Sequence, residues 1–149
     1  MMGNDHVLVM EVGPRDGLQN EAALLPAADK IALVHRLVDC GLRAVEVTSF
    51  VSPRWVPQLA DADQVLPAIA RRPGVDYPVL VPNLAGYARA RTAGADSIAV
   101  FTAASEAFSQ RNTNASIAQT LERFAPVIEQ ARADGVRVRG YVSTVLGCP

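Results

Sequence analysis

The stretch Ala93-Gly94-Ala95-Asp96-Ser97-Ile98-Ala99-Val100 has a pattern that two other stretches of the chain repeat. These are Cys40-Gly41-Leu42-Arg43-Ala44-Val45-Glu46-Val47 and Asp134-Gly135-Val136-Arg137-Val138-Arg139-Gly140-Tyr141. In each, a glycine follows a helical pattern, and glycine readily adopts the left-handed backbone conformation that ends a helix. The apolar or alternating run after the glycine is typical of a β-strand. Each repeat therefore predicts the end of a helix followed by a strand.

Extended to the whole chain, this pattern predicts five strands separated by four helices. The strands are expected near residues 7–12, 43–48, 77–82, 97–102 and 137–142. The helical segments are 27–39, 62–72, 84–92 and 117–133, the last of them capped by Ser116. We expect a kink or a late helix start at Pro67 and Pro126, because proline removes a backbone donor. No linker interrupts the pattern, so residues 1–149 are expected to form a single domain.

Composition and charge exclude several classes of partner. The 149 residues have a formal net charge of −1, and the 14 basic residues are scattered apart from Arg71-Arg72, so we expect no nucleic-acid partner. No stretch resembles a membrane span or a signal peptide, so we expect no membrane partner. Cys40 and Cys148 have neither disulfide nor metal spacing. We therefore expect a cytoplasmic protein.

Alternating strands and helices occur both in open, doubly wound sheets and in closed eightfold barrels. No Gly-x-Gly-x-x-Gly or phosphate-loop sequence follows the first predicted strand, which argues against the nucleotide-binding open sheets. A closed barrel typically needs about 250 residues, whereas this chain ends after five predicted strands. We therefore expect an α/β fold of the TIM (β/α)8 barrel family, here a partial barrel of about five strands with four crossover helices, the front part of something longer.

Polar side chains gather where the predicted strands end. They are Arg15, Asp16, Gln19, Asn20, Ser49, Asn83, Ser105 and Ser143. In both architectures the carboxyl ends of the strands form the ligand-binding face. We therefore expect the functional site at this end of the sheet.

The first predicted strand leads into Glu11-Val12-Gly13-Pro14-Arg15-Asp16-Gly17-Leu18-Gln19-Asn20-Glu21, which concentrates charged and amide side chains. Arg15 and Asp16 are the strongest candidate pair, because charged groups at a strand end lose hydration unless they pair, bind a metal or meet a ligand. The alternative is an ordinary surface turn in which Asp16 caps local backbone amides. Both interpretations stay open at this point.

Two further acids are expected to point inward from neighbouring strands. Glu46 lies in Val45-Glu46-Val47-Thr48, so its carboxylate has apolar neighbours and needs a partner. A structural ion pair with an arginine is the alternative interpretation. Glu11 is in the same situation one strand earlier. Two inward acids beside an Arg-Asp pair can hold a divalent cation and polarise a carbonyl.

Other conspicuous side chains have structural explanations. His6 and His35 are not expected at the strand-end face, and Trp55 is expected to cover the end of the barrel. Asn112 follows Ser109-Gln110-Arg111, which we predict to be irregular. Cys148 has no identifiable base nearby and is expected to be an ordinary turn thiol.

Four stretches, residues 11–21, 45–58, 78–84 and 139–149, closely resemble the 3-hydroxy-3-methylglutaryl-CoA lyase family. The wider superfamily of Claisen-type enzymes on TIM barrels shares mainly an Arg-Asp-Gly-x-Gln core. In contrast, the sequences from Gly13 to Glu21 and from Ser49 to Pro53 are similar to the lyase branch. The resemblance extends over essentially the whole chain.

The resemblance implies a metal-dependent retro-Claisen cleavage of 3-hydroxy-3-methylglutaryl-CoA to acetyl-CoA and acetoacetate, with Mg²⁺ or Mn²⁺ as the cofactor. It implies that Asp16 is a metal ligand and that Arg15 stabilises the enolate of the departing acetyl thioester. Glu46 would position or help deprotonate the tertiary hydroxyl. Glu11 is placed with Arg15 and Glu46 in the catalytic group.

The partner implied by the resemblance is a small-molecule acyl-CoA substrate, of which CoA is a part. Gln19, Ser49 and Tyr141 would line its site, with Asn112 near the CoA portion. The family's other metal ligands, a His-x-His pair and a later asparagine, fall beyond residue 149. We therefore expect no turnover from this chain alone, and homo-oligomers or other association through open barrel edges.

Two alternatives to the lyase remain. A homocitrate- or isopropylmalate-type synthase would run the condensation with acetyl-CoA, although the lyase-like Gln19-Asn20-Glu21 argues against it. A non-catalytic fragment or acyl-CoA binding module would keep the ligand-binding face without the metal.

Overall fold

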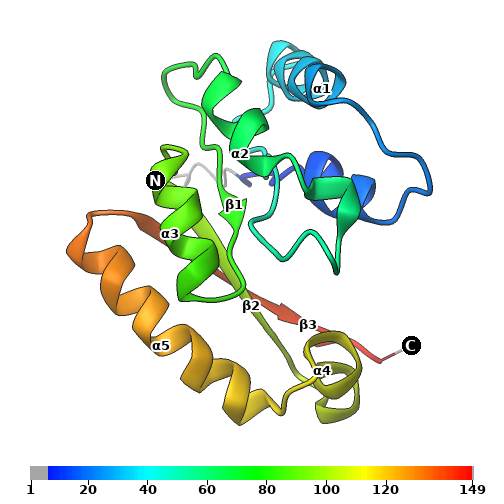
Figure 1. The fold of residues 1–149 in the computed structure, drawn as a ribbon, viewed down its shortest axis with the longest axis vertical. Coiled ribbons are helices and arrows are strands. Elements are labelled where there is room, and N and C mark those ends of the chain that lie inside the picture. The colour runs from blue at the N-terminus through cyan, green and yellow to red at the C-terminus, as the bar shows by residue number, and fades with distance from the viewer. Residues whose placement is uncertain (1–6, 149) are drawn as a thin grey trace, which may run out of the picture.

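The computed structural model describes residues 7–148, and Figure 1 shows how their helices and strands are arranged. The helices are α1 (Ala27–Asp39), α2 (Ala62–Val65), α3 (Leu84–Thr92), α4 (Glu106–Thr113) and α5 (Ile117–Ala133). The strands are β1 (Val79–Leu80), β2 (Ser97–Ala103) and β3 (Arg137–Ser143). Three short helical turns complete the list: η1 (Gly13–Gly17), η2 (Pro57–Leu59) and η3 (Leu66–Ala68).

The three strands form an open parallel sheet in the order β1-β2-β3. Two earlier segments continue it on the β1 side through parallel bridges between Ser49 and Leu80 and between Glu11 and Val45. Spatial order therefore follows chain order, as it does in a TIM barrel. In Figure 1, α3 and α5 lie side by side next to β2. The fold is an open part of a TIM barrel, as the sequence predicts.

The strands predicted at 97–102 and 137–142 are confirmed, the one predicted at 77–82 is too long, and those predicted at 7–12 and 43–48 do not form as strands in the described residues. The segments at 7–12 and 43–48 form only isolated bridges, and the one at 77–82 is reduced to Val79–Leu80. Proline explains part of this difference. The Pro78 carbonyl accepts a hydrogen bond from Val47 N at 3.0 Å, but Pro78 has no N–H to return one, so the ladder is interrupted there.

The predicted helix ends are confirmed where the repeats place them. Gly41, Gly94 and Gly135 have φ values of +97°, +85° and +67°, the left-handed conformation that ends a helix. Ser116 and Gln119 form a reciprocal cap at the start of α5: Ser116 Oγ accepts from Gln119 N at 3.1 Å, and Gln119 Oε1 accepts from Ser116 N at 2.9 Å.

The two prolines have different effects on their helices. The helix predicted at 62–72 is too long, since α2 ends at Val65 and Pro67 lies in η3. Pro126 lies inside α5, which nevertheless begins at Ile117, so the expected late start does not occur there.

Helix α4 was not predicted from the sequence. Ser109, Gln110 and Arg111, expected to be irregular, lie within it. Ser105 caps its start by accepting a hydrogen bond from Phe108 N at 3.3 Å, and Asn114 ends it in the left-handed conformation. The helix is short and polar, so apolar periodicity does not reveal it.

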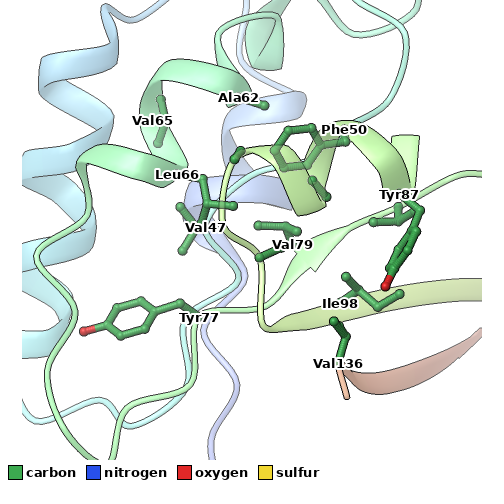
Figure 2. Packing of buried hydrophobic residues seen from close by; sticks show 14 of the residues in the cluster. Val47, Phe50, Ala62, Val65, Leu66, Tyr77, Val79, Tyr87, Ile98 and Val136 are labelled. Atoms are coloured by element: carbon green, nitrogen blue, oxygen red, sulfur yellow. The ribbon is translucent and has the colours of Figure 1, made fainter. Parts of the chain in front are cut away.

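The hydrophobic core lies where the strand segments face the helices. Figure 2 shows Val47, Val79 and Ile98 from successive segments of the sheet packed among larger side chains, including Phe50 and Leu66. All five are buried. None of the helices within residues 7–148 combines the length and the hydropathy of a transmembrane span.

Gly86 in α3 provides a test of this packing. A Cβ atom at Gly86 would lie 2.7 Å from Pro82 Cδ and 2.8 Å from the Phe50 carbonyl oxygen. We predict that Gly86→Ala destabilises the protein by about 1–3 kcal/mol, although the same change in an unobstructed helix is stabilising. Gly140→Ala is the matched control, since a Cβ there meets no atom within 4 Å. Thermal melting of both variants checks this, and an unchanged or raised Tm for Gly86→Ala would contradict it.

Apolar side chains are exposed near both sides of the open sheet. Val7 is 88% exposed before the first bridge, and Val142 is 56% exposed on β3. Val138, also on β3, is 37% exposed. We therefore predict that the 149-residue chain self-associates as its concentration rises, because unpaired strand edges and apolar surface favour association. Sedimentation velocity checks this. A single monomeric boundary at all concentrations, without binding of a hydrophobic dye, is the contrary result.

Candidate active site

A cleft of about 1010 Å³ lies beside the loops that follow the strand segments. Arg15 and Asp16 contribute to it from η1, and Ser143 from the end of β3. Trp55 contributes from the loop after Ser49. The position agrees with the ligand-binding face that the sequence predicts.

The cleft borders a buried ion pair between Arg15 and Glu46. Glu46 is fully buried between Val45 and Val47, and the Arg15 side chain is 13% exposed. Arg15 Nε donates a hydrogen bond to Glu46 Oε1. A buried carboxylate is stable only when charge and hydrogen bonds compensate for its lost hydration. The alternative interpretation of Glu46, an ion pair with an arginine, therefore describes the arrangement seen here.

Tyr141 occupies the other oxygen of the same carboxylate. Its hydroxyl donates to Glu46 Oε2 at 2.7 Å. Burial, reinforced by this hydrogen bond to the carboxylate, raises the pKa of Tyr141 well above its ordinary value. The hydroxyl therefore stays protonated and remains a donor. Both oxygens of Glu46 are thus engaged.

Asp16 lies at the exposed end of this network. Its side chain is 52% exposed, and Oδ1 accepts a hydrogen bond from Arg15 Nη1 at 2.6 Å. The carboxylate thus pairs with a guanidinium and does not act as the local backbone cap that the surface-turn interpretation proposed. The backbone of η1 presents both side chains to the cleft, with Asp16 N bonded to Val12 O at 2.6 Å.

Glu11 is held by its own loop. Its Oε1 accepts a hydrogen bond from Gly13 N at 2.6 Å, and a Cβ at Gly13 would lie 2.7 Å from that oxygen. The residues lining the cleft include Arg15 and Asp16 but neither Glu11 nor Glu46. The two acids predicted to point inward therefore support the loop and the arginine in this structure.

The remaining predicted site residues divide into two groups. Gln19, Asn112 and Tyr141 line the cleft. Ser49 does not: it is fully buried, and its hydroxyl donates to Leu80 O at 3.3 Å. The structure therefore does not bring Ser49 together with the others.

Sequence reasoning missed Arg111, Arg123 and Phe108, which also line the cleft. Arg111 and Phe108 belong to α4 and Arg123 to α5. Ser105, which caps the start of α4, is the signal in the sequence that could have predicted a helix containing Phe108 and Arg111. Recognising it would have put a basic side chain beside Asn112.

The described histidine and the two cysteines do not line the cleft. His35 Nε2 accepts a hydrogen bond from Ala70 N at 3.0 Å, and His6 lies outside the described residues. Cys40 and Cys148 form no disulfide, and Arg111 Nη2 donates to Cys148 Sγ at 3.6 Å. Trp55 is 80% exposed, so it covers little of the barrel end in this structure.

The described residues provide only some of the ligands that a divalent cation needs. No group of three or more His, Cys, Asp or Glu side chains within residues 7–148 is arranged to hold a metal. Asp16 supplies one accessible carboxylate, while Glu46 is engaged by Arg15 and Tyr141. Mg²⁺ and Mn²⁺ favour six oxygen or nitrogen ligands, so the described residues alone do not make a complete site.

Two acids that bind the same arginine allow a matched test of burial. We predict that Glu46→Gln lowers the free energy of unfolding by about 3 kcal/mol, since it leaves the mostly buried Arg15 charge without its buried partner. Asp16→Asn is expected to cost less than about 1 kcal/mol, because the Asp16 carboxylate is half exposed. Urea denaturation of both variants measures the difference, and equal losses would show that burial of Glu46 is not the deciding factor.

Curated relatives of this chain are acyl-CoA lyases. The 3-hydroxy-3-isohexenylglutaryl-CoA/hydroxymethylglutaryl-CoA lyase of Pseudomonas aeruginosa is 59% identical over 143 residues, which are 96% of this chain and 48% of the relative. The mitochondrial hydroxymethylglutaryl-CoA lyase of Gallus gallus is 56% identical, with the same coverage of both chains. The cytoplasmic 3-hydroxy-3-methylglutaryl-CoA lyase of Mus musculus is 55% identical over 97% of this chain and 42% of the relative. The chain thus spans about half the length of the curated relatives it matches.

Solved structures give the same result. The hydroxymethylglutaryl-CoA lyase of Pseudomonas aeruginosa matches with a TM-score of 0.90 and 59% identity, covering 94% of this chain and 47% of the other. A lyase of Acinetobacter baumannii, in complex with coenzyme A and 3-methylmalate, matches with a TM-score of 0.90 at 37% identity, covering 95% of this chain and 46% of the other. The HMGL-like family model matches residues 6–147. By sequence and by fold, the chain belongs to the HMGL-like family.

Proposed function

We propose that this chain is the part of a carbon-carbon lyase that holds the arginine side of the active site, and that the substrate is 3-hydroxy-3-methylglutaryl-CoA. The observation that carries the proposal is Arg15, held at a cleft by the buried carboxylate of Glu46. The similarity to lyases over 96% of the chain supports it.

The reaction needs a fixed positive charge where negative charge develops. When the tertiary hydroxyl loses its proton, it becomes the ketone of acetoacetate as the neighbouring carbon-carbon bond breaks. The bonding electrons pass to the acetyl thioester, which leaves as an enolate and is then protonated to acetyl-CoA. A guanidinium held in place beforehand stabilises such an oxyanion most strongly in a site that excludes water.

Arg15 suits this role because it retains donors. A guanidinium has five N–H donors, and the two carboxylates engage it through Nε and Nη1. Arg15 itself lines the cleft. Glu46 fits the positioning role better than the role of base, since its two oxygens already accept hydrogen bonds from Arg15 and Tyr141.

We also propose that Asp16 is one ligand of a divalent cation, Mg²⁺ or Mn²⁺. Its exposed carboxylate beside the cleft has the oxygen chemistry that these ions prefer. When bound, such an ion supplies Lewis acidity to a substrate oxygen. The resemblance places the other ligands beyond residue 149, which agrees with relatives about twice as long as this chain.

The cleft is large enough for an extended thioester. Its volume of about 1010 Å³ lies at the upper end of the range for small-molecule sites. Asn112 is proposed to lie near the CoA portion, and Gln19 near the acyl group. Coenzyme A is bound in the structure of the Acinetobacter baumannii lyase named above, which supports this class of ligand. A cytoplasmic location remains a prediction, since the matched relatives include both cytoplasmic and mitochondrial lyases.

A hybrid protein tests the proposal directly. Residues 1–149 are joined to the carboxyl-terminal half of the Pseudomonas aeruginosa lyase, and acetoacetate release is measured with Mg²⁺ or Mn²⁺. We predict that Asp16→Asn weakens Mn²⁺ binding in calorimetry, since it removes a charged ligand. We expect Arg15→Lys to keep metal affinity but lower kcat about 10²–10³-fold, because lysine keeps the charge and loses the planar fork.

The 149-residue chain alone is the control and is expected to release no acetoacetate. Equal Mn²⁺ affinity in the unsubstituted hybrid and in Asp16→Asn would contradict the assignment of Asp16 as a metal ligand. A hybrid that binds acyl-CoA without cleaving it would favour the binding-module alternative, and one that condenses acetyl-CoA with a keto acid would favour the synthase.

A further inference from the structure

The hydrogen bond between Tyr141 and Glu46 joins strand segments that are not neighbours. Tyr141 lies on β3, which pairs with β2, and β2 pairs with β1. The segment that contains Glu46 lies on the far side of β1. Neighbouring strands are about 4.8 Å apart, so the two backbones would be about 14 Å apart in a flat sheet. Because side chains stand roughly perpendicular to a sheet, a contact of 2.7 Å across two intervening strands indicates that the sheet is curved.

The contact is the middle of a continuous chain of interactions that ends at the cleft. The Arg139 guanidinium lies 5.4 Å from the centre of the Tyr141 ring. The Tyr141 hydroxyl donates to one oxygen of Glu46, and the other oxygen accepts from Arg15 Nε. Arg15 then reaches Asp16 through Nη1 at 2.6 Å. Each member therefore restricts the next, from β3 to the edge of the cleft.

We propose that Tyr141 is a positioning residue that sets the orientation of Arg15 through Glu46 when the sheet takes its curved form. Its hydroxyl is engaged by the carboxylate, so it acts through Glu46 rather than as a direct ligand of the substrate. Without this donor, Glu46 Oε2 is a buried acceptor with no compensating bond, and the carboxylate turns to recover one. Arg15 Nε then loses the well-aligned hydrogen bond to Glu46 that fixes its position.

The consequence for catalysis rests on the proposed function, whereas the positioning itself does not. A misplacement of a catalytic group by about 1 Å can lower a rate about 100-fold. Tyr141 is therefore expected to affect kcat in the complete enzyme more than KM. Its effect on Arg15 is measurable in the chain without any substrate.

Tyr87 provides a matched control. Its hydroxyl also donates to a carboxylate, Asp134 Oδ2, at 2.6 Å. Burial raises the pKa of Tyr87 to about 12, again with help from the hydrogen bond. This pair joins α3 to the end of α5 and includes no residue that lines the cleft. Tyr141→Phe and Tyr87→Phe thus remove the same kind of bond from two places.

The test is NMR of the 149-residue chain labelled with ¹⁵N-arginine. The Nε–H resonance of Arg15 is assigned by its disappearance in Arg15→Lys. We predict that Tyr141→Phe shifts this resonance and speeds its exchange with solvent about tenfold or more, since weaker hydrogen bonding exposes the proton. Tyr87→Phe is expected to leave it unchanged. An unchanged Arg15 resonance in folded Tyr141→Phe overturns the proposal.

A second variant covers the case in which Tyr141→Phe does not fold. Placing 3-fluorotyrosine at position 141 keeps the ring and the hydroxyl but makes the donor more acidic. The Arg15 Nε–H resonance is then expected to shift, and the same substitution at position 87 is expected not to move it. No shift from position 141 overturns the proposal.

The hybrid enzyme supplies the kinetic measurement. Tyr141→Phe is expected to lower kcat about 10- to 100-fold with KM within about twofold of the unsubstituted value, as for an interaction made in the transition state. Equal kcat in Tyr141→Phe and the unsubstituted hybrid overturns the catalytic consequence. If the unsubstituted hybrid has no lyase activity, the proposed function is contradicted but the positioning role is not. The Arg15 Nε–H resonance then decides whether Tyr141 positions Arg15.

Discussion

The burial of the Glu46 carboxylate is the constraint on which the site depends. Glu46 is fully buried, and its neighbours in the sequence, Val45 and Val47, are buried as well. An ionised carboxylate loses several kcal/mol of hydration in such a place unless charge and hydrogen bonds replace the water. Arg15 supplies the charge and one bond, and Tyr141 supplies the second. The same two bonds that make the burial tolerable also fix an arginine at the edge of a cleft.

The network leads from the interior to solvent in one direction. Exposure of the side chains rises from zero at Glu46 to 13% at Arg15 and 52% at Asp16. An arginine held at its inner side can use its outer donors for a ligand, because the guanidinium is planar and its donors diverge. The Asp16 carboxylate is left half exposed at the cleft. Arg15 and Asp16 thus present a guanidinium and a carboxylate side by side at the cleft, with the guanidinium anchored by the buried Glu46.

The fold places these residues through its curvature. The carboxyl ends of the parallel segments lie together, which brings the loop after Glu11 beside the end of β3. Curvature then allows Tyr141 and Glu46 to meet across two strands. The hydrogen bonds of the sheet and the core that packs against α3 and α5 form within the described residues, and apolar side chains are exposed near the open sides of the sheet. The site is held by the hydrogen bonds of Glu46 to Arg15 and Tyr141, whereas the open sides of the sheet carry exposed apolar side chains such as Val7 and Val142.

Local signals in the sequence determined the alternation of helices and strands, the helix ends at Gly41, Gly94 and Gly135, and the cap at Ser116, because each depends on a few consecutive residues. They also placed Arg15 and Asp16 at the ligand-binding face. Periodicity did not find the short polar α4 or the interruption of the sheet at Pro78, where one missing donor outweighs strand propensity. Only the tertiary structure decided that Ser49 turns away from the cleft and that Tyr141 bonds to Glu46, because a hydrogen bond between residues 95 positions apart depends on how far the sheet curves.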